Sequence, residues 1–219
     1  MIKINELFDL NETIAKEIFS QKEFPWEVLP CIKDFIIELG SKLPKDKFDE
    51  IRPNVWVAKN AKIFESAYID APCIIDEEAE IRQCAFIRGS AIIGKKAVVG
   101  NSCEIKNAIL FNNVQVPHFN YVGDSILGYK AHMGAGSITS NVKSDKTLVV
   151  IKDKQEIYET KLKKVGAMLG DNVEIGCNSV LCPGSVVGRN TIVYPLSMVR
   201  GVIEEKVIYK NKSEVAERR

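Results

Sequence analysis

An aliphatic residue recurs at every sixth position through the first half of the chain. Isoleucine or valine stands at Val57, Ile63, Ile69, Ile75, Ile81, Ile87, Ile93, Val99 and Ile105. The period of an amphipathic helix, about 3.6 residues, does not explain this spacing. The pattern predicts an all-β fold, a left-handed parallel β-helix built from hexapeptide repeats.

Small residues accompany the repeat. They stand four positions after most of the aliphatic residues, at Ala61, Ala67, Cys73, Ala79, Ala85, Ala91, Ala97 and Cys103. We expect sharp turns there, because only small side chains fit beside the stacked aliphatic residues. The six cysteines form no C-x-x-C pair, and Cys73 and Cys103 occupy the small-residue position, so buried, reduced thiols are expected.

The repeat continues less regularly and then becomes strict again. Two five-residue spacings, from Ile105 to Leu110 and from Val122 to Leu127, interrupt the stretch that continues through Leu110, Val116, Val122, Leu127 and Met133. The strict period returns at Leu169, Ile175, Leu181, Val187, Val193 and Val199. The short spacings predict bulges or a shifted corner, which often re-aim side chains near active sites. Glycine follows several of these positions, at Gly123, Gly128, Gly134, Gly170, Gly176 and Gly188. We expect these glycines to supply the open backbone conformations of tight corners.

Residues 1–50 follow a helical pattern instead. Asn11 is suited to cap a helix that continues to about Ser20, and Pro25 stands where a second helix would begin, with apolar residues at helical spacing up to Leu39. We expect an N-terminal α-helical cap over the open end of the β-helix, whose unpaired backbone groups invite edge pairing. A specialised binding domain is the alternative.

The repeat breaks between Thr139 and Val165. A short alternating run over 148–152 and a polar turn over 153–155 predict a protruding arm at about 140–165, able to reach a neighbouring subunit. The β-helix then covers 51–205, and a basic C-terminal tail covers 206–219. Basic residues cluster in the arm and the tail, at Lys161, Lys163, Lys164, Lys206, Lys210, Lys212, Arg218 and Arg219. Each cluster is either a solvated surface or a contact for the phosphates of a cofactor.

Charge and hydropathy exclude several classes of function. The formal net charge is +1, with basic and acidic residues interleaved, which argues against a general nucleic-acid binder. The chain has no apolar stretch long enough to cross a bilayer and no pattern of a secretory signal. We expect a cytoplasmic protein that binds neither nucleic acid nor membrane.

The chain has only two histidines, His118 and His132. Two histidines in one chain cannot form a three-histidine zinc site, and no cysteine and histidine spacing suits a structural metal, so we expect no metal. His118 follows a proline beside a spacing defect, and Asn120, Tyr121 and Asp124 stand near it to orient an imidazole. His118 is therefore the candidate for acid–base chemistry, although a lone histidine is as often structural.

Two stretches resemble a known family. The run P-H-F-N-Y-V-G-D-S-I-L-G-Y-K-A-H-M-G-A-G-S-I-T-S-N covers 117–141, and K-K-V-G-A-M-L-G-D-N-V-E-I-G-C-N-S-V-L-C-P-G covers 163–184. The first is similar to the acetyltransferase domain of the bifunctional bacterial enzymes that make UDP-N-acetylglucosamine, and the second to the archaeal branch of that group. The resemblance covers about 51–205. It implies an acetyl-CoA-dependent N-acetyltransferase for an amino-sugar phosphate, most simply glucosamine-1-phosphate, which works as a homotrimer with its cofactor cleft between adjacent chains.

The resemblance also assigns roles to individual residues. His118 matches the general base, and Arg88 and Lys106 match the two residues that grip the sugar phosphate. The remaining matches are Tyr121 and His132 at the sugar, and Ala135, Asn141, Cys177 and Pro195 at acetyl-CoA. Asn141 and the corner from Gly134 to Gly136 are the candidates for stabilising the oxyanion of the transition state.

Several positions depart from the family pattern. His132 stands where those enzymes carry asparagine, Val142 and Lys143 replace Tyr-Asp, and Thr147 replaces a lysine. These departures leave the reaction type in place but leave the amino sugar open, with a nucleotide-linked amino sugar as the alternative acceptor. The G-x-G-T-R-type loop of a nucleotidyltransferase is not present. A non-catalytic β-helical subunit that partners a separate nucleotidyltransferase is the remaining alternative.

Overall fold

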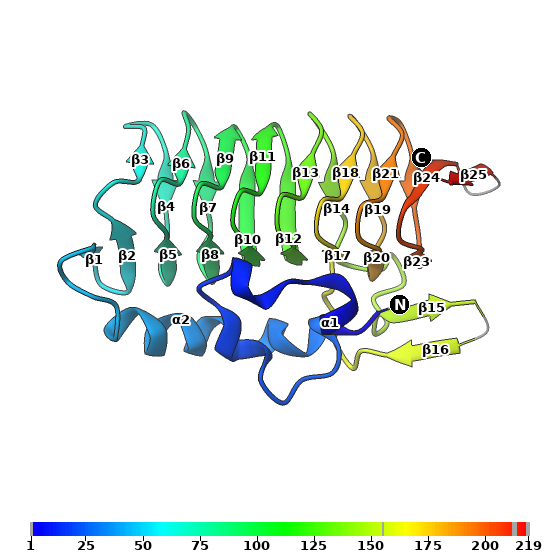
Figure 1. The fold of residues 1–219 in the computed structure, drawn as a ribbon, viewed down its shortest axis with the longest axis horizontal. Helices are drawn as coiled ribbons and strands as arrows, with labels where there is room; N and C mark the ends of the chain where they lie inside the picture. Colours follow the sequence, from blue (N-terminus) through cyan, green and yellow to red (C-terminus); the bar gives the residue numbers. More distant parts are fainter. Residues whose placement is uncertain (1, 155, 212–213, 218–219) are drawn as a thin grey trace.

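Most of the chain winds into a triangular prism of short parallel strands. The computed structural model describes residues 2–154, 156–211 and 214–217. The prism begins at Val55 and fills the upper half of Figure 1. Residues on successive turns pair in regular register, Val55 beside Cys73 and Cys73 beside Ala91. The predicted left-handed parallel β-helix is confirmed.

The strands of the prism form three faces, here called face I, face II and face III. Face I contains β2 (Val55–Ala58), β5 (Cys73–Ile75), β8 (Ala91–Ile93), the second halves of β10 (Glu104–Leu110) and β12 (Tyr121–Leu127), β17 (Ala167–Leu169), β20 (Ser185–Val187) and β23 (Val202–Ile203). Face II contains β3 (Lys62–Ile63), β6 (Glu80–Ile81), β9 (Val98–Asn101), β11 (Gln115–His118), β13 (His132–Met133), β18 (Glu174–Ile175), β21 (Ile192–Val193) and β24 (Val207–Asn211). Face III contains β4 (Tyr68–Ile69), β7 (Phe86–Ile87), the first halves of β10 and β12, β14 (Ile138–Thr139), β19 (Val180–Leu181) and β22 (Met198–Val199).

The repeating aliphatic residues fill the inside of the prism. Ile75, Ile81 and Ile87 are fully buried, and the small residues of the repeat from Cys73 to Cys103 are buried, whereas Ala61 and Ala67 are partly buried. Cys73 and Cys103 are buried as expected. Burial raises the pKa of the Cys73 thiol to about 12, because a thiolate there would lie in an apolar interior.

The glycines of the second half have a different role from the one predicted. None of the six expected at open corners has a positive φ, and that conformation falls instead on residues such as Cys84, Lys96 and Asn178. A Cβ on Gly134 would lie 2.6 Å from the carbonyl oxygen of Ile175 on the next turn. The prediction of special backbone angles was therefore wrong, and glycine is required because adjacent turns approach too closely for a side chain.

The N-terminal segment is helical but irregular. It contains α1 (Ile4–Leu7), the 3₁₀ helices η1 (Leu10–Glu12), η2 (Lys16–Phe19) and η3 (Pro25–Cys31), and α2 (Ile32–Ser41). The helix expected from Asn11 to Ser20 is replaced by two short 3₁₀ turns, and the side chain of Asp9, not Asn11, caps the first of them. The second predicted helix does begin at Pro25, as 3₁₀ and then α-helix.

This segment lies along face I and not over the open end of the prism, as Figure 1 shows. Helix α2 contacts β5, β8 and β10, and η3 contacts β12. At that end, β1 (Phe48–Arg52) pairs antiparallel with β2 and so covers the edge of face I. The reason lies in the strands of face I, where two consecutive residues, such as Ile74 and Ile75, are both aliphatic and fully buried. One side chain points into the prism, so the other needs an apolar cover.

The arm contains a hairpin of β15 (Val150–Asp153) and β16 (Glu156–Glu159). It packs on its own chain. The ring of Tyr158 lies 5.5 Å from the ring of Phe24 and 6.4 Å from that of Trp26, and Lys154 pairs with Glu204 at 2.8 Å. These contacts join the arm to the N-terminal segment and to the last turns of the prism.

The region predicted as a basic tail is largely strand. β24 adds a parallel strand to β21, and β25 (Glu214–Glu217) folds back antiparallel on β24. The tail prediction was therefore wrong for these residues. Lys212, Arg218 and Arg219 lie outside the described residues.

Candidate functional site

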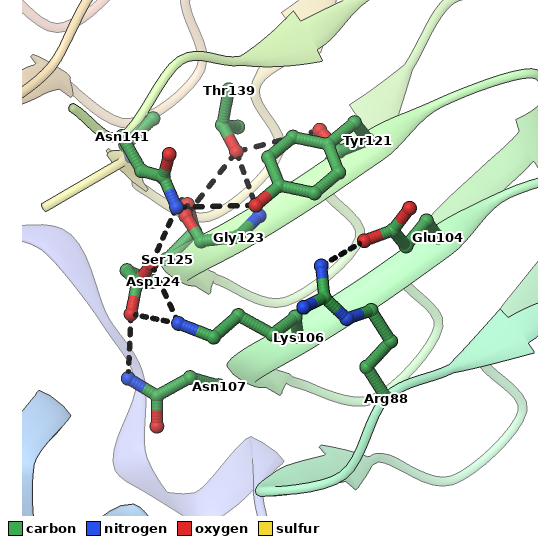
Figure 2. Close-up of polar contacts among 11 residues, drawn as sticks. Arg88, Glu104, Lys106, Asn107, Tyr121, Gly123, Asp124, Ser125, Thr139 and Asn141 are labelled. Atoms are coloured by element: carbon green, nitrogen blue, oxygen red, sulfur yellow. Dashed lines mark hydrogen bonds and ion pairs between the residues drawn. The ribbon is translucent and has the colours of Figure 1, made fainter. Parts of the chain in front are cut away.

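A polar network occupies the edge between face III and face I. We call it the Asp124 network, after the residue that joins Lys106, Asn107, Tyr121 and Asn141 (Figure 2). The Asp124 carboxylate accepts hydrogen bonds from Lys106 Nζ at 3.0 and 3.2 Å, from Asn107 Nδ2 at 2.9 Å and from Asn141 Nδ2 at 2.5 Å. Asp124 is only 3% exposed, so its charge is neutralised by Lys106 and not by water.

The five-residue spacings build this edge. They make β10 and β12 run through the corner as single seven-residue strands, with the left-handed residues Asn107 (φ 48°) and Asp124 (φ 49°) at the bend. Asparagine and aspartate tolerate this conformation better than other non-glycine residues. The predicted irregularity is therefore confirmed as a shifted corner, and it aligns polar side chains from successive turns.

Tyr121 and Asn141 meet at the outer side of the network. Asn141 Nδ2 donates to the Tyr121 hydroxyl at 3.1 Å as well as to Asp124, so both of its amide hydrogens are used. Its carbonyl oxygen then remains as the group available to a ligand, which favours an acceptor and not the oxyanion donor we expected. Burial, followed by the charge of Asp124, raises the pKa of Tyr121, so its hydroxyl keeps a proton to donate.

Arg88 lies beside this network and is paired separately. Its Nη1 donates to Glu104 at 2.7 Å, and this bond raises the pKa of the Arg88 guanidinium. Arg88 and Lys106, the two residues expected to hold a phosphate, thus lie on the same edge but each already has a carboxylate partner. The network and this ion pair together carry no net formal charge.

A second group of predicted residues follows the opposite edge of face III, where it meets face II. His118, Ala135, Cys177 and Pro195 come from successive turns. Backbone bonds join the turns, from Gly136 N to His118 O at 3.0 Å, from Asn178 N to Ala135 O at 2.9 Å and from Leu196 N to Cys177 O at 2.9 Å. The structure therefore separates the predicted residues into two edges of one face.

Asn120 fixes the turn that carries His118. Its side chain is 3% exposed, accepts from the backbone N–H of His118 at 3.0 Å and donates to the carbonyl oxygens of Gly134 and Ser137 at 2.8 and 3.0 Å. The imidazole itself is exposed and has no hydrogen bond to any described residue. Asn120 and Asp124 were expected to orient this ring, but the structure gives them other partners.

The turn from Gly134 to Gly136 offers one free donor beside His118. The N–H groups of Gly134, Gly136 and Ser137 bond to backbone carbonyls, whereas that of Ala135 has no acceptor among the described residues. A fixed, unpaired backbone N–H is the type of group that stabilises an oxyanion. It lies on the turn that directly follows the one carrying His118.

His132 does not join either group. It lies on face II, where its Nδ1 lies 2.7 Å from Glu174 Oε2 on the next turn. Within one chain, the residue that departs from the family pattern is thus remote from the Asp124 network. The described His, Cys, Asp and Glu residues form no group of three that could hold a metal ion. No helix in the described ranges is long and apolar enough to span a bilayer.

Sequence reasoning missed the central role of Asp124 and the contributions of Asn107 and Glu104. A usable signal was present. The two five-residue spacings end at Leu110 and Leu127, and Asn107 and Asp124 each stand three residues before one of these leucines. Equivalent positions on neighbouring turns of a β-helix lie side by side, so the two were candidates for a contact.

The fold is a hexapeptide-repeat β-helix in which the candidate residues follow two edges of one face. A family model described as the GMPPB C-terminal domain matches residues 69–203, more than half of the chain. The chain belongs to this family.

Curated relatives match a similar part of the chain. It is 34% identical over 112 residues to the bifunctional protein GlmU of Methanococcus maripaludis strain C5, covering 51% of this chain and 27% of the relative. It is 38% identical over 120 residues to GlmU of Methanococcus vannielii, covering 53% and 28%. The chain thus spans about a quarter of the length of these relatives. The solved structure of the polySia specific acetyltransferase NeuO has a TM-score of 0.46 at 15% identity, over 67% of this chain and 71% of that one, a likeness of fold alone.

Proposed function

We propose that the protein transfers an acetyl group from acetyl-CoA to the amine of an amino-sugar phosphate, with glucosamine-1-phosphate as the first candidate acceptor. The single observation that carries this proposal is that two groups needed for acyl transfer lie on adjacent turns at the edge between face II and face III. An exposed imidazole, His118, lies on one turn, and the unpaired N–H of Ala135 lies on the next. Acyl transfer needs these two groups, a base and an oxyanion donor.

The proposed chemistry divides between the two edges of face III. The imidazole of His118 takes a proton from the acceptor nitrogen as this nitrogen attacks the thioester carbonyl carbon. Negative charge develops on the carbonyl oxygen, where the N–H of Ala135 stabilises it. The C–S bond then breaks, and the thiolate of CoA takes the proton from the imidazolium. No charge is left on the protein at the end.

The Asp124 network supplies the binding groups for the sugar. Tyr121 offers a hydroxyl donor and Asn141 a carbonyl acceptor, and Asp124 holds Asn141 and Lys106 in place. His118 and Tyr121 are three residues apart, so their Cα atoms are separated by at most about 10 Å. One amino sugar can therefore contact both edges. Cys177 and Pro195 extend the edge of His118 over two further turns, which we assign to CoA in a homotrimer.

Thiol release from acetyl-CoA across a panel of amino sugars and their phosphates tests the proposal. We expect glucosamine-1-phosphate to support release. His118→Ala should lower turnover by roughly 10²- to 10⁴-fold, because the base is lost. His132→Ala removes the other imidazole of the chain and should change turnover by less than about tenfold.

The two histidine variants discriminate between outcomes. Equal turnover in the parent and in His118→Ala would exclude His118 as the base. Absence of release with every amino sugar would reject acetyl transfer to this class of acceptor. Thermal unfolding of both variants should match the parent, which separates loss of chemistry from loss of fold.

A further inference from the structure

A pocket of about 790 Å³ opens next to the Asp124 network, further along the same edge. We call it the Arg200 pocket. Ser140, Cys182 and Arg200 line it from successive turns, joined by backbone bonds from Ser140 N to Leu181 O at 2.8 Å and from Cys182 N to Val199 O at 2.9 Å. The loop that follows Asn141 and strand β15 of the arm form its other walls.

The charges in the Arg200 pocket are unbalanced. Lys143, Lys152 and Arg200 line it together with a single carboxylate, Asp145. Lys143 pairs with Asp145 at 3.3 Å, whereas Lys152 and Arg200 have no ion-pair partner among the described residues. The pocket therefore has an excess of positive charge and two cations free to bind an anion.

The Asp124 network and the adjoining Arg88–Glu104 pair differ from the Arg200 pocket in that their cations are paired. There, each cation already has a carboxylate partner, so a phosphate must compete with Glu104 or Asp124. In the Arg200 pocket an anion meets Lys152 and Arg200, which have no carboxylate partner among the described residues to displace. Charge-assisted hydrogen bonds to phosphate oxygens are among the strongest in proteins. A phosphorylated ligand gains more from the pocket than from the network.

The position of the pocket indicates which ligand enters it. Ser140 and Val142, which line it, flank Asn141, so the pocket continues directly from the proposed sugar site. Two turns of a β-helix separate Ser140 from Arg200, about 10 Å at the spacing of adjacent strands. The residues that we assign to CoA lie on the other edge of face III. The pocket is therefore on the acceptor side.

We propose that the Arg200 pocket binds the phosphate-bearing end of the acetyl acceptor, an inference that rests on the proposed function. Lys152 and Arg200 hold the phosphate oxygens. Val142, Val150 and Pro183 give the pocket apolar walls that a nucleoside can contact. The shared chemistry is a phosphate or diphosphate group on an amino sugar, carried either by a sugar-1-phosphate or by a nucleotide-linked sugar.

Calorimetric titration of the 219-residue chain with inorganic pyrophosphate, without acetyl-CoA, tests the pocket by itself. The double variant Lys152→Gln/Arg200→Gln should bind pyrophosphate about 10- to 100-fold more weakly, as expected for the loss of charge-assisted bonds. The control Lys62→Gln/Lys130→Gln removes the same charge from exposed positions outside the pocket and should leave binding unchanged. Equal weakening in both double variants would overturn the proposal.

The transfer assay then identifies the source of the phosphate. A higher KM of the double variant for glucosamine-1-phosphate indicates a sugar phosphate, and a higher KM for UDP-glucosamine alone indicates a nucleotide-linked acceptor. Both results support the proposal. A higher KM for acetyl-CoA alone would overturn it, because the pocket would then belong to the cofactor. If pyrophosphate binds in the pocket but no amino sugar is acetylated, the proposed function fails while the anion site stands.

Discussion

At the scale of single residues, one carboxylate organises the candidate site. Asp124 is 3% exposed and binds Lys106 and Asn107 of β10 together with Asn141, which follows β14. A buried charge is tolerated only when it is paired and hydrogen-bonded, and these partners satisfy both conditions. The orientation of Asn141, and hence the acceptor that it offers to a ligand, follows from this one side chain.

Asp124→Asn tests this dependence. Asparagine keeps the shape and tolerates the left-handed backbone at this position, but it removes the charge that compensates Lys106 and places an amide against other donors. We expect the free energy of unfolding to fall by about 2 kcal/mol. Asp145→Asn, an exposed ion-paired carboxylate, is the control and should leave the free energy of unfolding close to that of the parent. Urea unfolding measures both. Similar values for the two variants would contradict the buried role of Asp124.

At the scale of strands and turns, close stacking decides which residue fits. Cys73 at the start of β5 and Ala91 at the start of β8 occupy equivalent positions on neighbouring turns, and both are fully buried. The repeat therefore needs a small residue there and has no use for a thiolate. Because burial raises the pKa of Cys73 to about 12, from 9.0 for a free thiol, the folded chain keeps a proton that the unfolded chain releases.

This difference predicts a loss of stability in alkali. Below pH 9 both states hold the proton, and between pH 9 and about 12 only the folded state does, so the free energy of unfolding falls as the pH rises. From pH 8 to about pH 10.5 the parent should lose about 2 kcal/mol more than Cys73→Ala. Urea unfolding of both chains at the two pH values measures this. Parallel losses would show that folding does not raise the pKa of the Cys73 thiol.

The repeat made the prism predictable from the sequence, and its small defects located the site. Every sixth residue decides the inside of the fold, so nine aliphatic positions sufficed for the architecture. The outside was harder. An additional aliphatic residue beside the repeat position, such as Ile92 beside Ile93, indicated that one face is covered. This additional residue recurs only once per turn, in every third hexapeptide, so a search for a period of six does not find it. To predict a contact such as that between Lys106 and Asp124, one must know which residues of neighbouring turns lie side by side. The two five-residue spacings change this register.

At the scale of the whole molecule, the N-terminal segment completes the core. It covers face I from β5 to β12 (Figure 1), so that Ile92 is fully buried although it points away from the interior of the prism. Within the described residues, no segment covers face III in this way, and this face carries the candidate site along both edges. Phe86, at an outward position of face III, is 39% exposed. Face I, which the N-terminal segment covers, is therefore structural, and faces II and III remain accessible.

A matched pair of substitutions tests this division. Ile92→Lys places a charge between face I and helix α2 and should cost at least about 3 kcal/mol of the free energy of unfolding. Phe86→Lys makes a similar change at an exposed outward position and should cost less than about 1 kcal/mol. Thermal and urea unfolding compare the two chains. Equal losses would indicate that the N-terminal segment is not part of the folding unit.

Both ends of the prism finish in an antiparallel strand, β1 at one end and β25 at the other. A parallel β-helix with bare ends is a template on which further copies can stack without limit. On face I at one end and on face II at the other, the reversed strands remove that template, and β1 presents the charged residues Asp49, Glu50 and Arg52 at its edge. Axial stacking of further copies is thereby disfavoured on one face at each end of the prism.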